Sequence, residues 1–136
     1  MEMVAASRMR RAQEQALASR PYAAKAWEVL IHLAAMVGGE HHPLLSESKE
    51  TGAVAVVLVT GDRGLAGAYN GNVMRNTQRF IRDHGFDAKT IAVGRKGRDL
   101  LLRGGHELIA EFIDLPARPT ETDVAPIARV AIDTYL

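Results

Sequence analysis

The first 37 residues carry apolar and small side chains at the spacing of an amphipathic helix. A heptad register places these side chains on one seam and the charged residues off it, with Glu2 at the extreme start as the one exception. One core position of the register holds Met9, Ala16, Ala23, Leu30 and Val37, and the other holds Ala5, Ala12, Ser19, Ala26 and Leu33. The segment contains no glycine and is rich in residues that favour helix. The pattern predicts one long helix of coiled-coil type at residues 1–37.

Pro21 is the one residue of this segment that opposes a regular helix, because proline removes a backbone hydrogen bond. We expect a kink between Ser19 and Pro21. A helix of this length would extend for roughly 55 Å, which is more than a domain of this size needs to cover its own core. Part of the helix is therefore expected to project, and its apolar seam needs a partner helix that this sequence does not offer.

After the helix, short apolar runs alternate with glycine and polar residues. Residues 38–52 contain three glycines, two histidines and a proline, which indicates a linker. Residues 54–60 form a continuous β-branched run, typical of a central strand that is buried on both faces. Further strands are predicted at 89–93 and 107–113, and helices at 70–84, 97–103 and from a cap at Thr122 or Asp123 to 136. This order predicts an α/β domain over residues 53–136, with a Rossmann-like parallel sheet layer.

Charge and composition exclude several classes of protein. The 17 Lys and Arg nearly balance the 16 Asp and Glu, so no overall field draws the chain to nucleic acid or to an acidic membrane. No apolar run reaches the roughly 20 residues of a membrane span, and the absence of cysteine fits the cytoplasm. The cluster Arg8, Arg10 and Arg11 is a local exception. The cluster is either a solvent-exposed face or a binding site for an acidic protein surface or for nucleic acid. No aromatic residues interleave with it, as they do in many nucleic-acid sites.

Gly61, Gly64 and Gly67 follow the first predicted strand, where doubly wound folds place backbone N–H groups against phosphate. Their spacing, G-x-x-G-x-x-G, fits neither the dinucleotide fingerprint nor the Walker A pattern. Gly94-Arg95-Lys96 ends the second strand, where an acidic residue would bind a ribose. The glycines are therefore interpreted either as a tight turn at the edge of the sheet or as part of a Rossmann-type nucleotide-binding protein.

No catalytic or metal-binding pattern is visible. The five histidines are scattered, and neither H-E-x-x-H nor G-x-S-x-G occurs. We therefore expect a protein without an active site, a metal or a cofactor.

Two stretches, MEMVAASRMRRAQEQALASRPYA and VLVTGDRGLAGAYN, resemble the gamma subunit of F-type ATP synthases in their order and separation. The segment GRKGRDLLLRGG adds a weaker match. The resemblance implies a non-catalytic central-stalk rotor whose first and last helices form an antiparallel coiled coil inside the ring of alpha and beta subunits. In that family, proton flow turns the rotor and drives ATP synthesis. The implied partners are the alpha, beta and epsilon subunits and the membrane c-subunit ring, with no nucleic acid, at the cytoplasmic face of the cell membrane.

The resemblance also assigns candidate contact residues. Those that face the beta subunits are Met1, Met3, Arg8, Met9, Arg10 and Arg11. In the family, the loop after the first strand lies toward the epsilon subunit and the membrane ring, here through Asp62, Arg63 and Tyr69. Family members have more chain before Met1 and a long helix after Leu136. We therefore expect a fragment whose α/β domain is incomplete at its C-terminus and whose seam pairs with the absent last helix.

Overall fold

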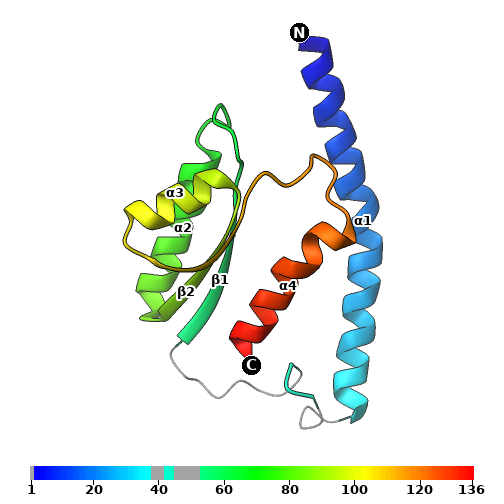
Figure 1. The fold of residues 1–136 in the computed structure, drawn as a ribbon. Coiled ribbons are helices and arrows are strands. Elements are labelled where there is room, and N and C mark those ends of the chain that lie inside the picture. The colour runs from blue at the N-terminus through cyan, green and yellow to red at the C-terminus, as the bar shows by residue number, and fades with distance from the viewer. Residues whose placement is uncertain (1, 38–41, 45–52) are drawn as a thin grey trace. The chain divides into compact units, whose positions relative to one another are not determined.

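The computed structural model describes residues 2–37, 42–44 and 53–136 (Figure 1). Backbone contacts divide the chain into two compact units, Met1–Glu47 and Ser48–Leu136. The first unit contains helix α1 (Glu2–Val37), and the second contains three strands and three helices. Each unit is described by itself.

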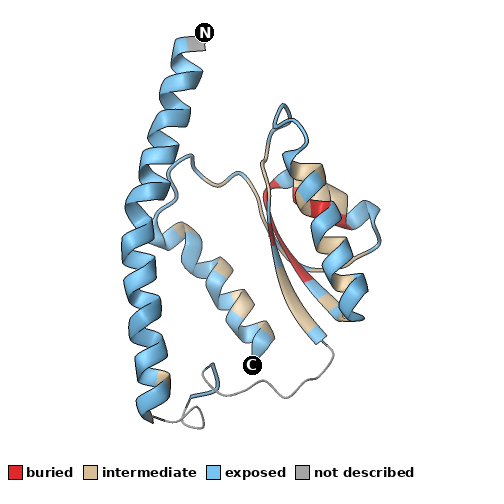
Figure 2. Cartoon of the chain, turned by 180° about the vertical axis from the view of Figure 1, so that it is seen from behind, coloured by how far each residue is buried: buried red, intermediate tan, exposed pale blue. Residues whose placement is uncertain are grey.

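α1 is a single helix of 36 residues, which confirms the predicted long N-terminal helix. Pro21 lies inside it, and the helix continues without a break on both sides of the proline. The side chain of Ser19 donates to the carbonyl oxygen of Ala16 (3.0 Å) within the same turn. Almost every described side chain of α1 is exposed (Figure 2). The helix therefore has no packing partner among the described residues of its own unit.

The second unit is built on a parallel sheet of β1 (Ala53–Val59), β2 (Asp87–Val93) and β3 (Glu107–Phe112), in the order β1-β2-β3. Helices α2 (Tyr69–His84) and α3 (Arg95–Arg103) cover one face of this sheet. Helix α4 (Glu121–Tyr135) lies on the other face, against β1 (Figure 1). The predicted α/β fold with a parallel sheet is confirmed.

The core lies between the sheet and the α2–α3 layer. Leu58, Met74, Ala92 and Leu101 form its buried cluster, one from each of β1, α2, β2 and α3. Thr90 on β2 is also fully buried, and its hydroxyl donates to the carbonyl oxygen of Glu107 on β3. The strands β1 and β2 and the inner faces of α2 and α3 thus form the core of this unit.

The predicted central position of β1 is wrong, because β2 is the central strand. Among the described residues, β1 pairs only with β2 and forms an edge of the sheet. Val57 is 39% exposed and Val59 54% exposed on this strand. The apolar sequence of β1 predicted burial on both faces, but α4 covers its outer face incompletely.

The predicted cap of the last helix is also wrong by two or three residues. Thr120 is the N-cap of α4, and it forms a capping box with Asp123, whose carboxylate accepts the N–H of Thr120 (2.7 Å). A capping side chain satisfies N–H groups that the first helical turn leaves free. Asp123 is therefore the third helical residue and not the cap.

Replacement of this cap should destabilise the second unit measurably. We expect Thr120→Ala to lower the free energy of unfolding of the full-length protein by about 1 kcal/mol, because an N-cap hydroxyl is lost. Arg129→Ala, at an exposed position of the same helix outside the cap, should cost less than about 0.5 kcal/mol. Urea unfolding followed by circular dichroism measures both changes. Equal losses in the two variants would contradict the assignment of the cap.

Candidate functional site

The three residues that follow β1 satisfy the free N–H groups of the first turn of α3. Asp62 Oδ1 accepts the N–H of Arg95 (2.9 Å), the Gly61 carbonyl that of Lys96 (3.0 Å), and Thr60 Oγ1 that of Gly97 (2.7 Å). A helix N-terminus normally leaves these groups open and attractive to anions. We call this arrangement the Thr60–Asp62 cap. It joins the end of β1 to the start of α3 at the carboxyl edge of the sheet.

Glycine is required where α3 approaches β1. Gly94 has φ +98°, and a Cβ at this position would lie 2.2 Å from the carbonyl oxygen of Thr60. A Cβ on Gly97 would lie 2.7 Å from Thr60 Oγ1. From its sequence alone, Gly94 was interpreted only as the end of a strand. The missed signal is the pair of glycines three residues apart, which permits this close approach.

Asp62 also holds the end of β3. Its Oδ1 accepts a second backbone N–H, from Asp114 (3.1 Å), in a segment where Asp114 has φ +55°. Hydrogen bonds from the N–H groups of Asp114 and then Arg95 lower the pKa of Asp62 below its usual value. The side chains of Arg95 and Asp114 form an exposed ion pair across the same edge (2.5 Å). One carboxylate therefore connects three segments of the chain.

This geometry leaves no open phosphate site at the start of α3, whereas the glycine loop of the nucleotide-binding alternative precedes α2. In Rossmann-type sites the N–H groups at a helix N-terminus bind the phosphates. At the start of α3 those groups already donate to Thr60, Gly61 and Asp62, and the Asp62 carboxylate supplies the negative charge. The glycine loop is thus the turn that brings this cap into position.

The loop from residue 63 to residue 68 projects beyond the cap. Leu65 at its tip is fully exposed and has φ +64°, which is unusual for a residue with a side chain. The base of the loop is fixed, because the Gly61 N–H donates to Asn70 Oδ1 (3.1 Å) and the Tyr69 hydroxyl donates to the Val59 carbonyl (3.2 Å). An exposed apolar tip on a fixed base is suited to contact with another protein.

The structure separates the three predicted loop residues by role. Asp62 is half-buried and engaged in the cap, whereas Arg63 and Tyr69 are exposed. Arg63 has no carboxylate partner among the described residues. Arg63 is therefore available for contacts, whereas the hydroxyl of the exposed Tyr69 helps to fix the base of the loop.

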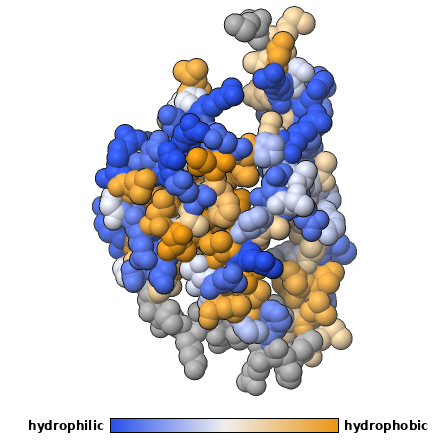
Figure 3. Space-filling view, in the orientation of Figure 1, coloured by the Kyte–Doolittle hydropathy of each residue, from blue (hydrophilic) through white to orange (hydrophobic). Residues whose placement is uncertain are grey.

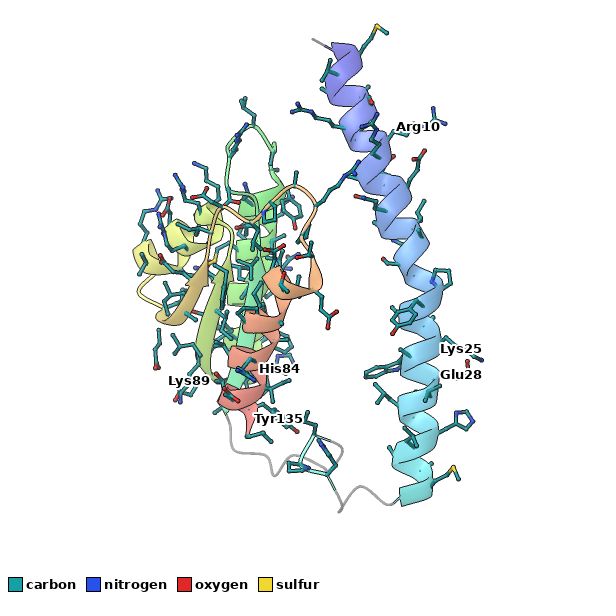
Figure 4. The ribbon with its side chains drawn as sticks, turned by 45° about the vertical axis from the view of Figure 1, so that its right-hand side comes forward. Arg10, Lys25, Glu28, His84, Lys89 and Tyr135 are labelled. Atoms are coloured by element: carbon teal, nitrogen blue, oxygen red, sulfur yellow. The ribbon has the colours of Figure 1, made fainter. Side chains whose placement is uncertain are left out.

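The predicted contact residues of α1 lie on the first turns of an exposed helix. Met1 is outside the described residues. The described members are all exposed, namely Met3, Arg8, Met9, Arg10 and Arg11. Arg10 (Figure 4) donates from its Nε to Glu14 Oε1 one turn along the helix (3.2 Å). Both side chains are exposed, so this ion pair contributes little.

The second half of α1 exposes a wider apolar surface than a coiled-coil seam. Trp27 is 66% exposed and Met36 is 83% exposed, although nine residues place them about 180° apart around the helix. Val29, Leu30, Ile31 and Leu33 are exposed as well. Figure 3 shows hydrophobic side chains gathered over this half of the helix. On the polar side, Lys25 and Glu28 form an ion pair (2.8 Å; Figure 4). One partner helix cannot cover both sides of this surface.

Neither a metal-binding cluster nor a membrane-spanning helix is found in the part of the chain that the structure describes. No group of three or more His, Asp or Glu among those residues is arranged to hold a metal ion. None of the described helices combines the length and the apolar composition that a membrane span needs.

Comparison with known proteins gives one consistent family. The family model described as ATP synthase matches residues 1–136, the whole chain. The chain is 46% identical to the ATP synthase gamma chain of Herpetosiphon aurantiacus, over 99% of this chain and 48% of that protein. It is 44% identical to the same-named protein of Desulfitobacterium hafniense and 43% to that of Moorella thermoacetica, again over 48% of each.

The chain belongs to the ATP synthase gamma-chain family. It spans about half the length of the gamma chains that it matches. The family identified from the two sequence stretches is thereby confirmed, and the chain is a subunit sequence of an ATP synthase.

Proposed function

We propose that this chain forms the first part of the central-stalk rotor of a proton-translocating F-type ATP synthase. α1 is one strand of the shaft inside the ring of alpha and beta subunits, and the α/β unit lies toward the epsilon subunit and the membrane c-subunit ring. Proton flow turns the rotor, and the rotor forces the beta subunits through the conformations that make ATP. The subunit itself is non-catalytic and sits peripherally at the cytoplasmic face of the cell membrane.

The observation that carries this proposal is a 36-residue helix with an unburied apolar surface in a chain that matches gamma chains along its whole length. A helix of that length extends for about 54 Å, enough to serve as a shaft. Its seam is narrow and rich in alanine at the start, where Ala5, Ala12 and Ala16 allow close approach of a second helix. The partner strand of this coiled coil is a terminal helix that the relatives' further length can supply.

The broader apolar surface around Trp27 and Met36 needs a second neighbour besides the coiled-coil partner. A shaft is buried on one side by its partner helix and contacts the surrounding subunits on the other. The polar first half, by contrast, fits a surface that slides past its neighbours and does not bind them permanently.

The arginines of the first turns are the proposed electrostatic contacts with acidic loops of the beta subunits. Arg8 and Arg11 are three residues apart, so they lie on one flank of α1. Both are exposed and lack a carboxylate partner among the described residues. Met3 and Met9 beside them supply adaptable apolar contact, and Met1 completes the set. On the α/β unit, Arg63 and Tyr69, which follow the Thr60–Asp62 cap in the chain, are the proposed contacts toward the epsilon subunit and the ring.

Charge removal on α1 tests this assignment. In the full-length subunit, Arg8→Gln, Arg10→Gln and Arg11→Gln together should weaken association with the alpha–beta ring about tenfold at low ionic strength, since surface charge pairs are screened by salt. The matched control removes three exposed cations elsewhere, with Lys89→Gln, Arg118→Gln and Arg129→Gln. Surface plasmon resonance at two salt concentrations measures the affinity. A control that loses as much affinity as the α1 variant would overturn the contact assignment.

A further inference from the structure

Charges in the second unit are segregated along the chain. Residues 69–103 carry eight Lys and Arg against three Asp and no Glu. Residues 104–136 carry two Arg against six Asp and Glu. The first of these segments contains α2 and α3, which lie together on one face of the sheet (Figure 1). The outer side of this helical layer is therefore strongly basic.

Three of the cations form a stripe on α2. Arg75, Arg79 and Arg82 are spaced by four and three residues, which places them on one flank of the helix, and all three are exposed. Gln78 lies on that same flank, and its Nε2 is 3.4 Å from Nε2 of His106, just after α3. The stripe thus runs along the side of α2 that is next to α3.

Two further cations extend the stripe onto α3. Leu100 packs against the buried core, which includes Met74 of α2. Lys96 lies four residues before Leu100 and Arg103 three residues after it, so both lie on the same side of α3 as Leu100. The pKa of Asp99 is lowered first by the hydrogen bond from Arg98, and also by the charges of Arg98, Arg103 and Lys96. The five residues of this surface, which we call the basic face, are Arg75, Arg79, Arg82, Lys96 and Arg103.

Most of the nearby carboxylates pair with cations outside the basic face, and Asp83, beside Arg82, forms no ion pair among the described residues. Asp99 and Glu111 both pair with Arg98 (2.8 and 3.7 Å), and Asp114 pairs with Arg95. Within residues 2–37, 42–44 and 53–136, no member of the basic face has a carboxylate partner. Like charges separated by less than a Debye length, about 10 Å at 0.1 M salt, repel one another. Arg75 donates to Asn72 Oδ1 and Arg103 to the Asp99 carbonyl, and the Asp99 carboxylate attracts Lys96 and Arg103, so the five positive charges are only partly balanced in the chain alone.

We propose that the basic face binds an acidic segment of a partner protein. Carboxylates relieve the repulsion, and the arginine forks suit them geometrically. The exposed Phe80 and Tyr69 lie on the opposite flank of α2, so no ring interleaves with the cations as in single-strand nucleic-acid sites. The face also lacks an apolar strip for insertion into lipid. It includes neither α1 nor the loop at 63–69, so the proposal stands apart from the rotor contacts.

Binding of a defined probe tests the proposal on the full-length subunit. The probe is a short fluorescent helical peptide rich in Glu, compared with the same peptide carrying Gln in place of Glu. Arg79→Gln, Arg82→Gln and Lys96→Gln together should weaken binding of the Glu peptide about tenfold at low salt. The matched control, Lys89→Gln, Arg118→Gln and Arg129→Gln, removes the same charge and should change binding less than twofold.

Four outcomes would overturn the proposal. They are an equal loss in the two triple variants, binding of the Gln peptide as tight as that of the Glu peptide, tighter binding of duplex DNA or of anionic phosphatidylserine vesicles than of the Glu peptide, and no binding of the Glu peptide. Fluorescence anisotropy distinguishes them in one set of titrations.

A second test uses the assembled complex, in which Lys96 is the one amine of the basic face. Carbodiimide treatment condenses an amine with a carboxylate that is in contact with it. We expect a cross-link from Lys96 to an Asp or Glu of another subunit, identified by mass spectrometry, and its loss in Lys96→Arg, which keeps the charge and removes the amine. Cross-links from Lys96 that stay within the chain, or none, would contradict docking at this face.

Discussion

Gly94→Ala is expected to destabilise the full-length protein by more than about 3 kcal/mol, because two independent costs coincide at this position. The residue has φ +98°, and the new Cβ would lie 2.2 Å from the Thr60 carbonyl oxygen. That oxygen belongs to the backbone at the end of β1 and cannot rotate away. Relief of the clash would separate α3 from β1 and break the Thr60–Asp62 cap.

The matched variant for Gly94→Ala is Gly67→Ala. Gly67 also has a positive φ (+54°), but a Cβ there meets nothing within 4 Å. It should therefore cost only the conformational penalty, about 1 kcal/mol. Urea unfolding compares the two variants directly. If they lose the same stability, the close packing of α3 on β1 is not what requires glycine at position 94.

Asp62→Ala is expected to destabilise the protein by about 2 kcal/mol at neutral pH, because it leaves the N–H groups of Arg95 and Asp114 without their acceptor. Asp62→Asn keeps the shape and one carbonyl oxygen, so it should recover part of this loss. Unfolding of both variants in urea, with hydrogen exchange at the two amides, measures the effect and its location. Unchanged exchange at Arg95 and Asp114 in Asp62→Ala would contradict the role of the cap.

The pH dependence follows from the lowered pKa of Asp62 in the folded protein. A carboxylate with a depressed native pKa adds stability that is complete above its unfolded value, about 3.9. That contribution is lost as the pH falls through the lower native value. The difference in free energy of unfolding between the natural protein and Asp62→Asn, measured by urea unfolding, should therefore shrink in acid. A constant difference from pH 7 to pH 3 would contradict the stabilising role of the Asp62 charge.

The sequence predicted the elements of this fold well, since their signals are local. The glycine-free run before Val37 and the β-branched run at 54–60 each reflect neighbouring residues alone. The position of β1 in the sheet could not be predicted in the same way. It depends on which strands are present to pair with both of its edges, and an apolar strand has the same sequence at either position.

The site at the edge of the sheet was predictable only in part. The glycine spacing and the unmatched fingerprints argued correctly against a phosphate loop. The cap itself joins Thr60–Asp62 to residues more than thirty positions later, and Asp62 reaches Asp114 over 52 positions. Such long-range backbone contacts leave no periodic pattern. The contacts of Arg8, Arg10, Arg11, Arg63 and Tyr69 with other subunits stay predictions.

Rotation is the most direct test of the proposed function. The full-length subunit that contains this chain is assembled with its alpha and beta subunits, the ring is fixed to a surface, and a bead is attached to the α/β unit. Addition of ATP should turn the bead continuously in one direction while ATP is hydrolysed. A complex that hydrolyses ATP with the subunit bound but stationary, or that assembles without it, would contradict the account.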